Sequence, residues 1–137
     1  MLLNQKAAPA ENFYVLTEPV AIDGDTLKVS IALGFGISKE TILRLKGWYA
    51  PELGGDNPTA ALAARDALQS FATAHRLTIR ARGLRMDLHG RWVAVLLKEG
   101  RPVEPHQVLG VLQLTPDQHA QDLRAQKRNR SGGAFPL

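Results

Sequence analysis

The sequence predicts an α+β domain in which a small antiparallel or barrel-like sheet packs against helices. The period of the apolar residues carries this prediction: it is two over residues 25–33, changes to a helical repeat over 58–75, and then returns to two. At 137 residues, with 45% hydrophobic side chains, the chain can form one core and has no linker that would divide it. We therefore expect one domain over residues 13–130, a flexible arm at 1–12 and a flexible tail at 131–137.

The N-terminal third of the chain predicts three strands, at residues 13–22, 25–33 and 39–47. Aromatic and β-branched residues fill the first strand, but Pro19 cannot donate to a ladder hydrogen bond and should interrupt it. The second strand alternates apolar and polar residues, and a Gly-Phe-Gly turn connects it to the third. In the third strand Leu43 and Leu45 share one face, so Arg44 is expected on the opposite face.

After a stretch rich in Pro and Gly, the pattern predicts helices and two more strands. Asn57 is suited to cap the first helix, and Pro58 is suited to its first turn. The final helix has good helix formers through Lys127. The expected spans are a helix at 58–75, strands at 77–82 and 92–98, a helical turn at 105–109 and a helix at 115–127.

The composition excludes several classes of protein. Without cysteine the chain forms no disulfide framework, no thiolate metal site and no cysteine nucleophile. No apolar run approaches the roughly 20 residues that a membrane-spanning helix needs. Residues 1–13 lack the hydrophobic region of a secretory signal. We therefore expect a cytoplasmic protein without a membrane partner, and a processed secreted form is the alternative.

The positive charge is unevenly distributed along the chain. Lys and Arg number 17 against 13 Asp and Glu, which gives a net charge of +4. Residues 122–137 contain four of the basic residues and one of the acidic ones, which leaves 13 and 12 in residues 1–121. The body of the domain is therefore nearly neutral, so the placement of individual charges must carry any argument for a polyanionic partner.

Three short segments carry candidate chemistry. Asp-Gly-Asp-Thr places Asp23 and Asp25 on either side of a glycine, just before a strand. Arg-Leu-Lys-Gly-Trp-Tyr-Ala-Pro-Glu carries Arg44 on a strand and Glu52 after a proline. Asp-Leu-His-Gly-Arg is a turn that delivers Arg91 just before an apolar strand. Taken singly, the first segment is typical of a simple turn and each arginine of a solvated surface.

Together, in this order and on these elements, the three segments resemble the staphylococcal nuclease (thermonuclease) family. The resemblance spans residues 13–114 and includes D-G-D-T, R-L-x-G-x-x-A-P-E, a helix, and D-x-x-G-R before a hydrophobic strand. It implies a five-stranded OB-type β-barrel with Greek-key wrapping and about three helices. The order of elements predicted from periodicity agrees with that fold.

The resemblance also implies an activity, the metal-dependent and usually calcium-dependent cleavage of phosphodiester bonds in DNA and RNA. By motif, Asp25 is implied as a carboxylate ligand of the cation, beside the backbone carbonyl of Ala50 and with Asp23 as a further candidate. The implied cofactor is therefore a divalent cation, Ca²⁺ in the first place, with Mg²⁺ or Mn²⁺ as alternatives. The implied partner is nucleic acid, DNA or RNA.

The remaining implied roles are catalytic. Glu52 would orient or deprotonate the attacking water, while Arg44 and Arg91 would clamp the scissile phosphate. The chemistry requires such groups because phosphodiester hydrolysis brings a nucleophile towards an anion. A cation and two guanidiniums neutralise that anion while one carboxylate serves the water.

The chain also departs from the family pattern at positions that matter for the site. Tyr49 stands where the family has an aspartate that supplies a second carboxylate to the metal, and His89 stands where a tyrosine contacts the nucleotide. Candidate nucleic-acid contacts are therefore His89 and Tyr49, with Arg80 and Arg82 on one outward strand face, where a solvated face is the equal alternative. The other histidines lack the spacing of metal ligands and are expected at the surface or at helix ends: His75, His106 and His119.

Two functions follow from these residues. In the first, the protein is a nuclease with weakened or altered metal dependence. In the second, it is a catalytically impaired nuclease-fold module that binds nucleic acid or a protein partner. The presence of Arg44, Arg91 and Glu52 together favours the enzyme, whereas Tyr49 favours the binding module.

Overall fold

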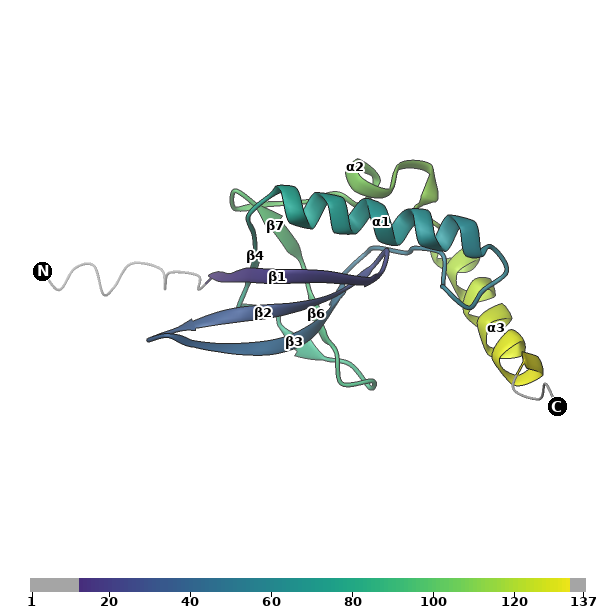
Figure 1. Ribbon diagram of the computed structural model, residues 1–137, viewed down its shortest axis with the longest axis horizontal. Coiled ribbons are helices and arrows are strands. Elements are labelled where there is room, and N and C mark those ends of the chain that lie inside the picture. The colour runs from purple at the N-terminus through teal and green to yellow at the C-terminus, as the bar shows by residue number, and fades with distance from the viewer. Residues whose placement is uncertain (1–12, 134–137) are drawn as a thin grey trace, which may run out of the picture.

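The computed structural model describes residues 13–133, and it confirms the α+β class: a curled mixed sheet packs against helices (Figure 1). The predicted arm at 1–12 and the last residues of the predicted tail lie outside the described residues. The strands are β1 (Phe13–Asp23), β2 (Thr26–Gly34), β3 (Ile37–Leu45), β4 (Leu77–Arg80), β5 (Arg85–Met86), β6 (Trp92–Ala94), β7 (Leu96–Lys98) and β8 (Arg101–Pro102). The helices are α1 (Pro58–Ala74), α2 (Pro105–Leu109), the 3₁₀ turn η2 (Gly110–Leu112) and α3 (Pro116–Gly133).

The three long strands β1, β2 and β3 form an antiparallel meander, as their alternation predicts. The predicted interruption of β1 at Pro19 is confirmed, because the register shifts between Thr17 and Val20. The order across the sheet is β5-β6-β3-β2-β1-β4-β7-β8. One pair, β3 with β6, is parallel, which makes the sheet mixed.

The sheet has eight strands where the resemblance implied five. Two of the additional strands, β5 and β8, are only two residues long. The third arises because the expected strand at 92–98 is broken at Val95 into β6, which pairs with β3, and β7, which pairs with β4. One short segment therefore pairs with β3 on one side of the meander and with β4, which lies beside β1 on the other side, and the sheet curls into a half-barrel.

The core lies between the inner face of this half-barrel and α1. Leu27, Leu43 and Leu45 are completely buried on the sheet side, and Leu68 is completely buried on α1. The predicted cap of α1 is confirmed, since the side chain of Asn57 accepts a hydrogen bond from the backbone N–H of a residue in the first turn. Burial of apolar surface on this scale is the main force that holds the sheet and helix together.

Gly24, in the turn between β1 and β2, packs so closely that no side chain fits. A Cβ atom there would lie 2.6 Å from the Cβ of Ala50 and 2.7 Å from the Cβ of Ala64. Both distances are well below van der Waals contact. The turn is therefore held against α1 and the loop after β3, which fixes the position of the two aspartates that flank the glycine.

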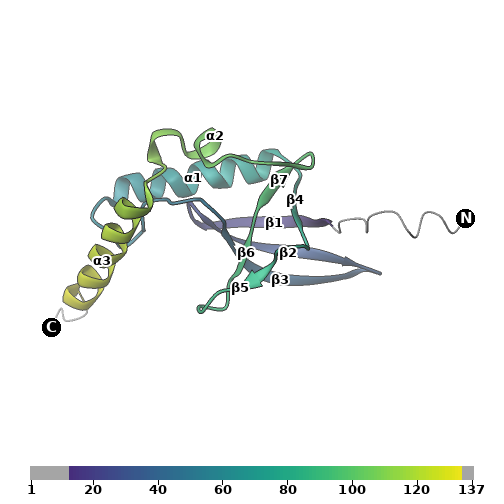
Figure 2. The ribbon, with the colours of Figure 1, turned by 180° about the vertical axis from the view of Figure 1, so that it is seen from behind.

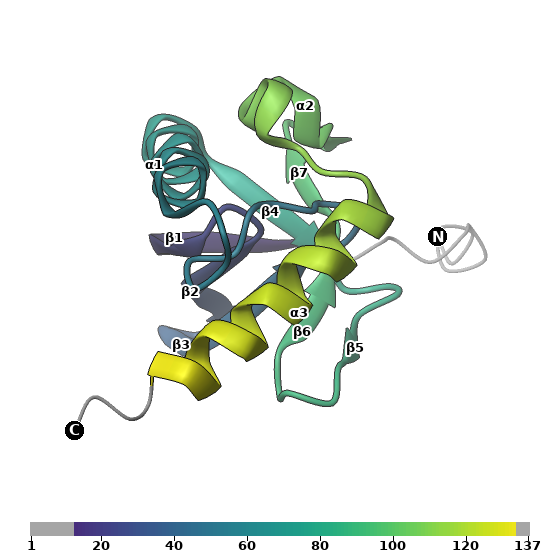
Figure 3. The same ribbon diagram turned by 90° about the vertical axis from the view of Figure 1, so that its right-hand side faces the viewer.

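Helix α3 crosses the end of the half-barrel diagonally, below α1 and α2 (Figure 3). The turn between β5 and β6 lies on the opposite side of the sheet from α1 and α2 (Figures 1 and 2). Within residues 13–133, no helix combines the length and the hydropathy needed to cross a membrane. The loop after β3, the β5–β6 turn and α3 together surround the candidate site.

Candidate functional site

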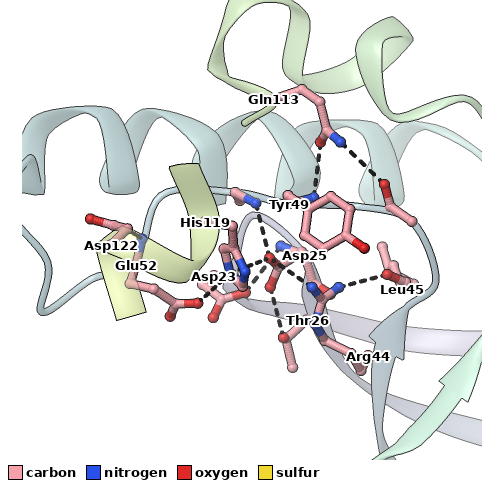
Figure 4. Close-up of polar contacts among 12 residues, drawn as sticks. Asp23, Asp25, Thr26, Arg44, Leu45, Tyr49, Glu52, Gln113, His119 and Asp122 are labelled. Atoms are coloured by element: carbon pink, nitrogen blue, oxygen red, sulfur yellow. Dashed lines mark hydrogen bonds and ion pairs between the residues drawn. The ribbon is translucent and has the colours of Figure 1, made fainter. Parts of the chain in front are cut away.

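Asp25 is the central group of the site, and several hydrogen bonds and ion pairs fix its carboxylate (Figure 4). Its carboxylate is only 2% exposed. Its Oδ2 accepts a 2.9 Å hydrogen bond from the backbone N–H of Ala50, and Thr26 Oγ1 donates to Oδ1 over 3.1 Å. The backbone N–H of Asp25 donates to Asp23 Oδ1 over 3.0 Å, which closes the tight turn. The carboxylate is thus fixed in orientation before any ligand arrives.

Asp23 lies beside Asp25 but has a different chemical character. Burial, together with the hydrogen bond to neighbouring Asp25 and the repulsion from its charge, raises the pKa of Asp23 to about 7. Among the described residues, the acidic and imidazole groups close enough to share an ion do not include Asp23. Its contact with the N–H of Asp25 indicates that it shapes the turn.

Arg44 lies on β3 and faces the site, which confirms the prediction from alternation. Its Nη2 lies 3.4 Å from Asp25 Oδ2, and its Nη1 donates to the backbone oxygen of Leu45 over 2.6 Å. The Arg44 side chain is 15% exposed, whereas the neighbouring leucines on the other face are completely buried. The guanidinium is therefore fixed by two partners at the edge of the cleft.

Tyr49 extends its ring between Arg44 and a histidine of α3. The guanidinium carbon of Arg44 is 5.7 Å from the centre of the tyrosine ring, and the ring of His119 is 5.3 Å away, centre to centre. The backbone of this loop is fixed from the far side, because the N–H of Tyr49 donates to Gln113 Oε1 over 3.0 Å and Leu114 donates to the oxygen of Tyr49 over 2.7 Å. An aromatic ring thus stands beside the buried carboxylate.

Glu52 and His119 complete the central cluster. His119 Nε2 lies 2.8 Å from Glu52 Oε1 and 3.7 Å from Asp25 Oδ2. One donor atom from each of these three residues lies within 4.8 Å of the others. They come from the β1–β2 turn, the loop after β3 and helix α3, three segments that are remote in sequence. Such a mixed set of oxygen and nitrogen atoms could hold a metal ion.

The placement of His119 corrects a sequence-based expectation. His119 does lie in the first turn of α3, but the expected surface position without ligand partners is wrong, because the residue is 8% exposed and faces two carboxylates. One sequence signal points to it: Asp122 and Gln126 follow at helical spacing and share its face. By contrast, His75 caps the end of α1 and His106 is exposed on α2, as expected.

Helix α3 is anchored to the loop that carries Glu52. Asp122 Oδ2 accepts a 2.6 Å hydrogen bond from the backbone N–H of Glu52, and Asn129 Nδ2 donates to the oxygen of Gly54 over 3.1 Å. Gly55 is required for this contact, since a Cβ there would approach Asp122 Oδ1 to 2.3 Å. The anchoring fixes the distance between the imidazole of His119 and the carboxylate of Glu52.

Arg91 reaches the same cleft from the turn between β5 and β6. Its Nε donates to Asp87 Oδ2 over 2.9 Å, and its backbone N–H donates to Asp87 Oδ1 over 3.0 Å. Burial acts to raise the pKa of Asp87, but hydrogen bonds from the N–H groups of Arg91 and His89 and from the Arg91 guanidinium outweigh it and hold that pKa below its usual range. Asp87 therefore stays ionised and orients the arginine.

A cleft of about 400 Å³ joins these groups. It is bordered by basic, acidic and imidazole side chains, and its polar lining comprises Arg44, Glu52, His89, Arg91, His119, Gln126 and Arg130. Three guanidiniums therefore border a cleft that contains the Glu52 carboxylate, and the buried Asp25 lies behind Glu52 and His119. This arrangement can attract a phosphate group and a cation at the same time.

The structure separates other predicted residues from this cleft. Arg80 and Arg82 line a different hollow, together with Lys46. For Ala50 the observed contact with Asp25 is made by its N–H, so the role of its carbonyl as a metal ligand stays a prediction. Among the four candidate nucleic-acid contacts, His89 lines the cleft and Tyr49 contacts the groups at its inner end.

No family model matches the chain, and no curated protein matches it.

Proposed function

We propose that the protein is a metal-dependent phosphodiesterase that cleaves DNA or RNA, built on an OB-type barrel of the staphylococcal nuclease kind. One observation carries the proposal: Arg44 and Glu52 of the second motif and Arg91 of the third line one cleft, and the buried Asp25 of the first motif lies directly behind Arg44 and Glu52. Each motif alone is typical of a turn or a solvated strand end. Their convergence is what a phosphodiester-cleaving site requires.

The donor atoms present fit a divalent cation. Asp25 and Glu52 would supply carboxylate oxygens and His119 an imidazole nitrogen, all within 4.8 Å of one another. When bound, the cation would polarise the phosphoryl oxygen and neutralise its charge. The hydrogen bonds from Ala50 and Thr26 to Asp25 keep the first carboxylate in place for that task.

The arginines would bind the scissile phosphate. Arg44 is fixed by Leu45 and Asp25, and Arg91 is fixed through Nε by Asp87, so that both forks are oriented at the cleft. A planar fork that is always protonated suits a phosphate whose equatorial oxygens gain charge in the transition state. Because both side chains are held in advance, little conformational entropy is lost when the phosphate binds.

Glu52 is also the base in this proposal: one of its two carboxylate oxygens would bind the cation, and the other would accept the proton. Water adds to phosphorus while its proton passes to the Glu52 carboxylate, and the bond from phosphorus to the ester oxygen breaks, with that oxygen taking a proton from solvent. His119 at 2.8 Å and the Asp122 contact on the Glu52 backbone hold this carboxylate towards the cleft.

Incubation of the protein with plasmid and with single-stranded DNA or RNA, in the presence of divalent cations or a chelator, tests this function. We expect metal-dependent cutting that the Glu52→Gln variant lacks. Glu40→Gln is a matched control, because Glu40 is an exposed carboxylate on β3 that pairs only with a surface lysine among the described residues. Cutting that survives in Glu52→Gln, or cutting by neither the parent nor Glu40→Gln, would contradict the proposal.

A second candidate function, binding of nucleic acid without cleavage, is favoured by Tyr49. Its ring lies between Arg44 and His119 and brings no carboxylate to the cluster. The Tyr49→Asp variant separates the two functions. Cleavage gained only in this variant would identify the parent chain as a binding module, whereas cleavage by the parent supports the enzyme.

A further inference from the structure

Asp25, Glu52 and His119 offer a set of donor atoms that differs from the ligands of a calcium site. Ca²⁺ takes six to eight oxygen ligands and disfavours nitrogen, whereas imidazole nitrogen suits first-row transition cations. Here the Tyr49 ring lies against His119, and the group that faces the two carboxylates is the imidazole of His119. The donor set thus contains two carboxylates and one nitrogen.

We propose that Asp25, Glu52 and His119 form a centre selective for a transition cation of the Mn²⁺, Co²⁺ or Zn²⁺ class over Ca²⁺ and Mg²⁺, with α3 supplying the selecting ligand. This metal centre lies in the site of the proposed phosphodiesterase. The inference rests on that proposed function only where it concerns how the metal is used. Binding itself can be measured without any cleavage.

The distances suit an ion of this size. Two ligands bound at about 2.1 Å to one ion lie roughly 3 to 3.5 Å apart. His119 Nε2 lies 2.8 Å from Glu52 Oε1 and 3.7 Å from Asp25 Oδ2, which brackets this spacing, and all three donor atoms lie within 4.8 Å of one another. The described chain has no cysteine to compete as a soft ligand.

The surroundings support ligation rather than a chance contact. The Asp25 carboxylate is bonded by the N–H of Ala50 and by Thr26, the kind of outer partner that orients metal-binding carboxylates. Helix α3 is tied down by Asp122 next to the Glu52 donor, so the imidazole is delivered at a set distance. Three protein donors leave coordination positions for water and substrate, as in catalytic centres.

Calorimetric titration of the full chain with Co²⁺, Zn²⁺, Mn²⁺, Ca²⁺ and Mg²⁺ tests the inference. We expect one site that binds Mn²⁺ more weakly than Co²⁺ and Zn²⁺, and that binds Ca²⁺ and Mg²⁺ more weakly than all three. His119→Ala should weaken Co²⁺ binding roughly 100-fold and change the visible spectrum of the bound Co²⁺. Ca²⁺ binding that equals or exceeds Co²⁺ binding in the parent would overturn the inference.

Two further variants make the test specific. His106→Ala removes an exposed histidine from α2, and it should leave Co²⁺ binding unchanged; an equal loss in both variants would mean adventitious surface binding and overturn the inference. His119→Asp replaces nitrogen by oxygen and should shift preference towards Ca²⁺ or Mg²⁺. Circular dichroism checks that the His119 variants stay folded.

The outcomes separate this inference from the proposed function. Selective Co²⁺ or Zn²⁺ binding that needs His119, without cleavage of any nucleic acid, would support the metal centre and count against the phosphodiesterase. Cleavage with Ca²⁺ that does not depend on His119 would overturn the metal centre and leave the phosphodiesterase standing.

Discussion

His119 Nε2 and Glu52 Oε1 lie 2.8 Å apart, and this contact joins the first turn of α3 to the loop after β3. Both side chains are largely buried, with 10% and 12% of their surface exposed. In this environment an imidazole and a carboxylate interact more strongly than they would in water. The pair thereby links the C-terminal helix to the groups that carry the proposed chemistry.

Arg91 should be irreplaceable by lysine in phosphodiester cleavage. Arg91→Ala and Arg91→Lys are each expected to lower kcat by roughly 100- to 1,000-fold, because an ammonium group cannot bond Asp87 through Nε and a phosphate through a planar fork at once. Arg101→Lys changes an exposed arginine that does not line the cleft, and it should retain full activity. Single-turnover cleavage assays provide the measurement, and restoration of the rate by lysine would argue for a purely electrostatic role.

Asp23 should make the protein less stable as the pH rises. Its pKa is about 7 in the folded protein against an ordinary value of 3.8, so between these values the folded state binds more protons than the unfolded chain. The free energy of unfolding should therefore fall from about pH 4 to about pH 7 and change no further, for this group, at higher pH. Urea denaturation at about pH 5 and about pH 8, in chelator, measures the effect.

The Asp23→Asn variant provides the comparison for that pH dependence. Asparagine keeps an oxygen that can accept the N–H of Asp25 but does not titrate. The variant should lose less stability than the parent between the two pH values. An identical loss in parent and variant would mean that other groups cause the pH dependence.

Gly24→Ala should destabilise the fold by roughly 1 to 3 kcal/mol. The new methyl group would overlap the side chains of Ala50 and Ala64, which belong to a loop and a helix that cannot both move aside. Gly54→Ala is a suitable control, since a Cβ there meets only the flexible side chain of Gln126, at 3.0 Å. Chemical denaturation curves of both variants give the comparison, and equal midpoints for the two would contradict the close packing of the turn.

The basic residues of α3 should contribute to nucleic-acid affinity mainly at low salt. Helix α3 has four Lys and Arg residues, all of them exposed: Arg124, Lys127, Arg128 and Arg130. Arg130 lines the cleft. Replacement of all four by glutamine should flatten the dependence of affinity on salt, with a slope smaller by about 0.7 for each phosphate of a single strand that the protein no longer neutralises. Fluorescence anisotropy in chelator, at about 50 and about 200 mM salt, measures binding apart from cleavage.

A control of matched charge shows whether placement matters for that affinity. Glutamine at four basic positions of the sheet removes the same net charge away from the cleft: Lys28, Lys39, Lys98 and Arg101. This variant should keep the salt dependence of the parent. If its affinity falls as far as that of the α3 variant, net charge rather than the position of α3 accounts for binding.

Local features of this protein follow from its sequence by itself. The alternation that forms β2 and β3, the cap that begins α1 at Asn57, and the break in β1 at Pro19 all depend on residues close in the chain. The same local rule placed Arg44 opposite two buried leucines and therefore at the site. Side-chain direction in a strand is set by the backbone period alone, so neighbouring residues suffice to predict it.

The tertiary structure alone decided how remote segments meet. The division of residues 92–98 at Val95 depends on two partner strands, β3 and β4, that compete for one short segment as the sheet curls. The burial of His119 depends on α3 docking against Glu52 and Gly55, through contacts between residues about 70 positions apart. A mostly polar helix carries little amphipathic signal of its own docking face, so its imidazole becomes part of the site only through those long-range contacts.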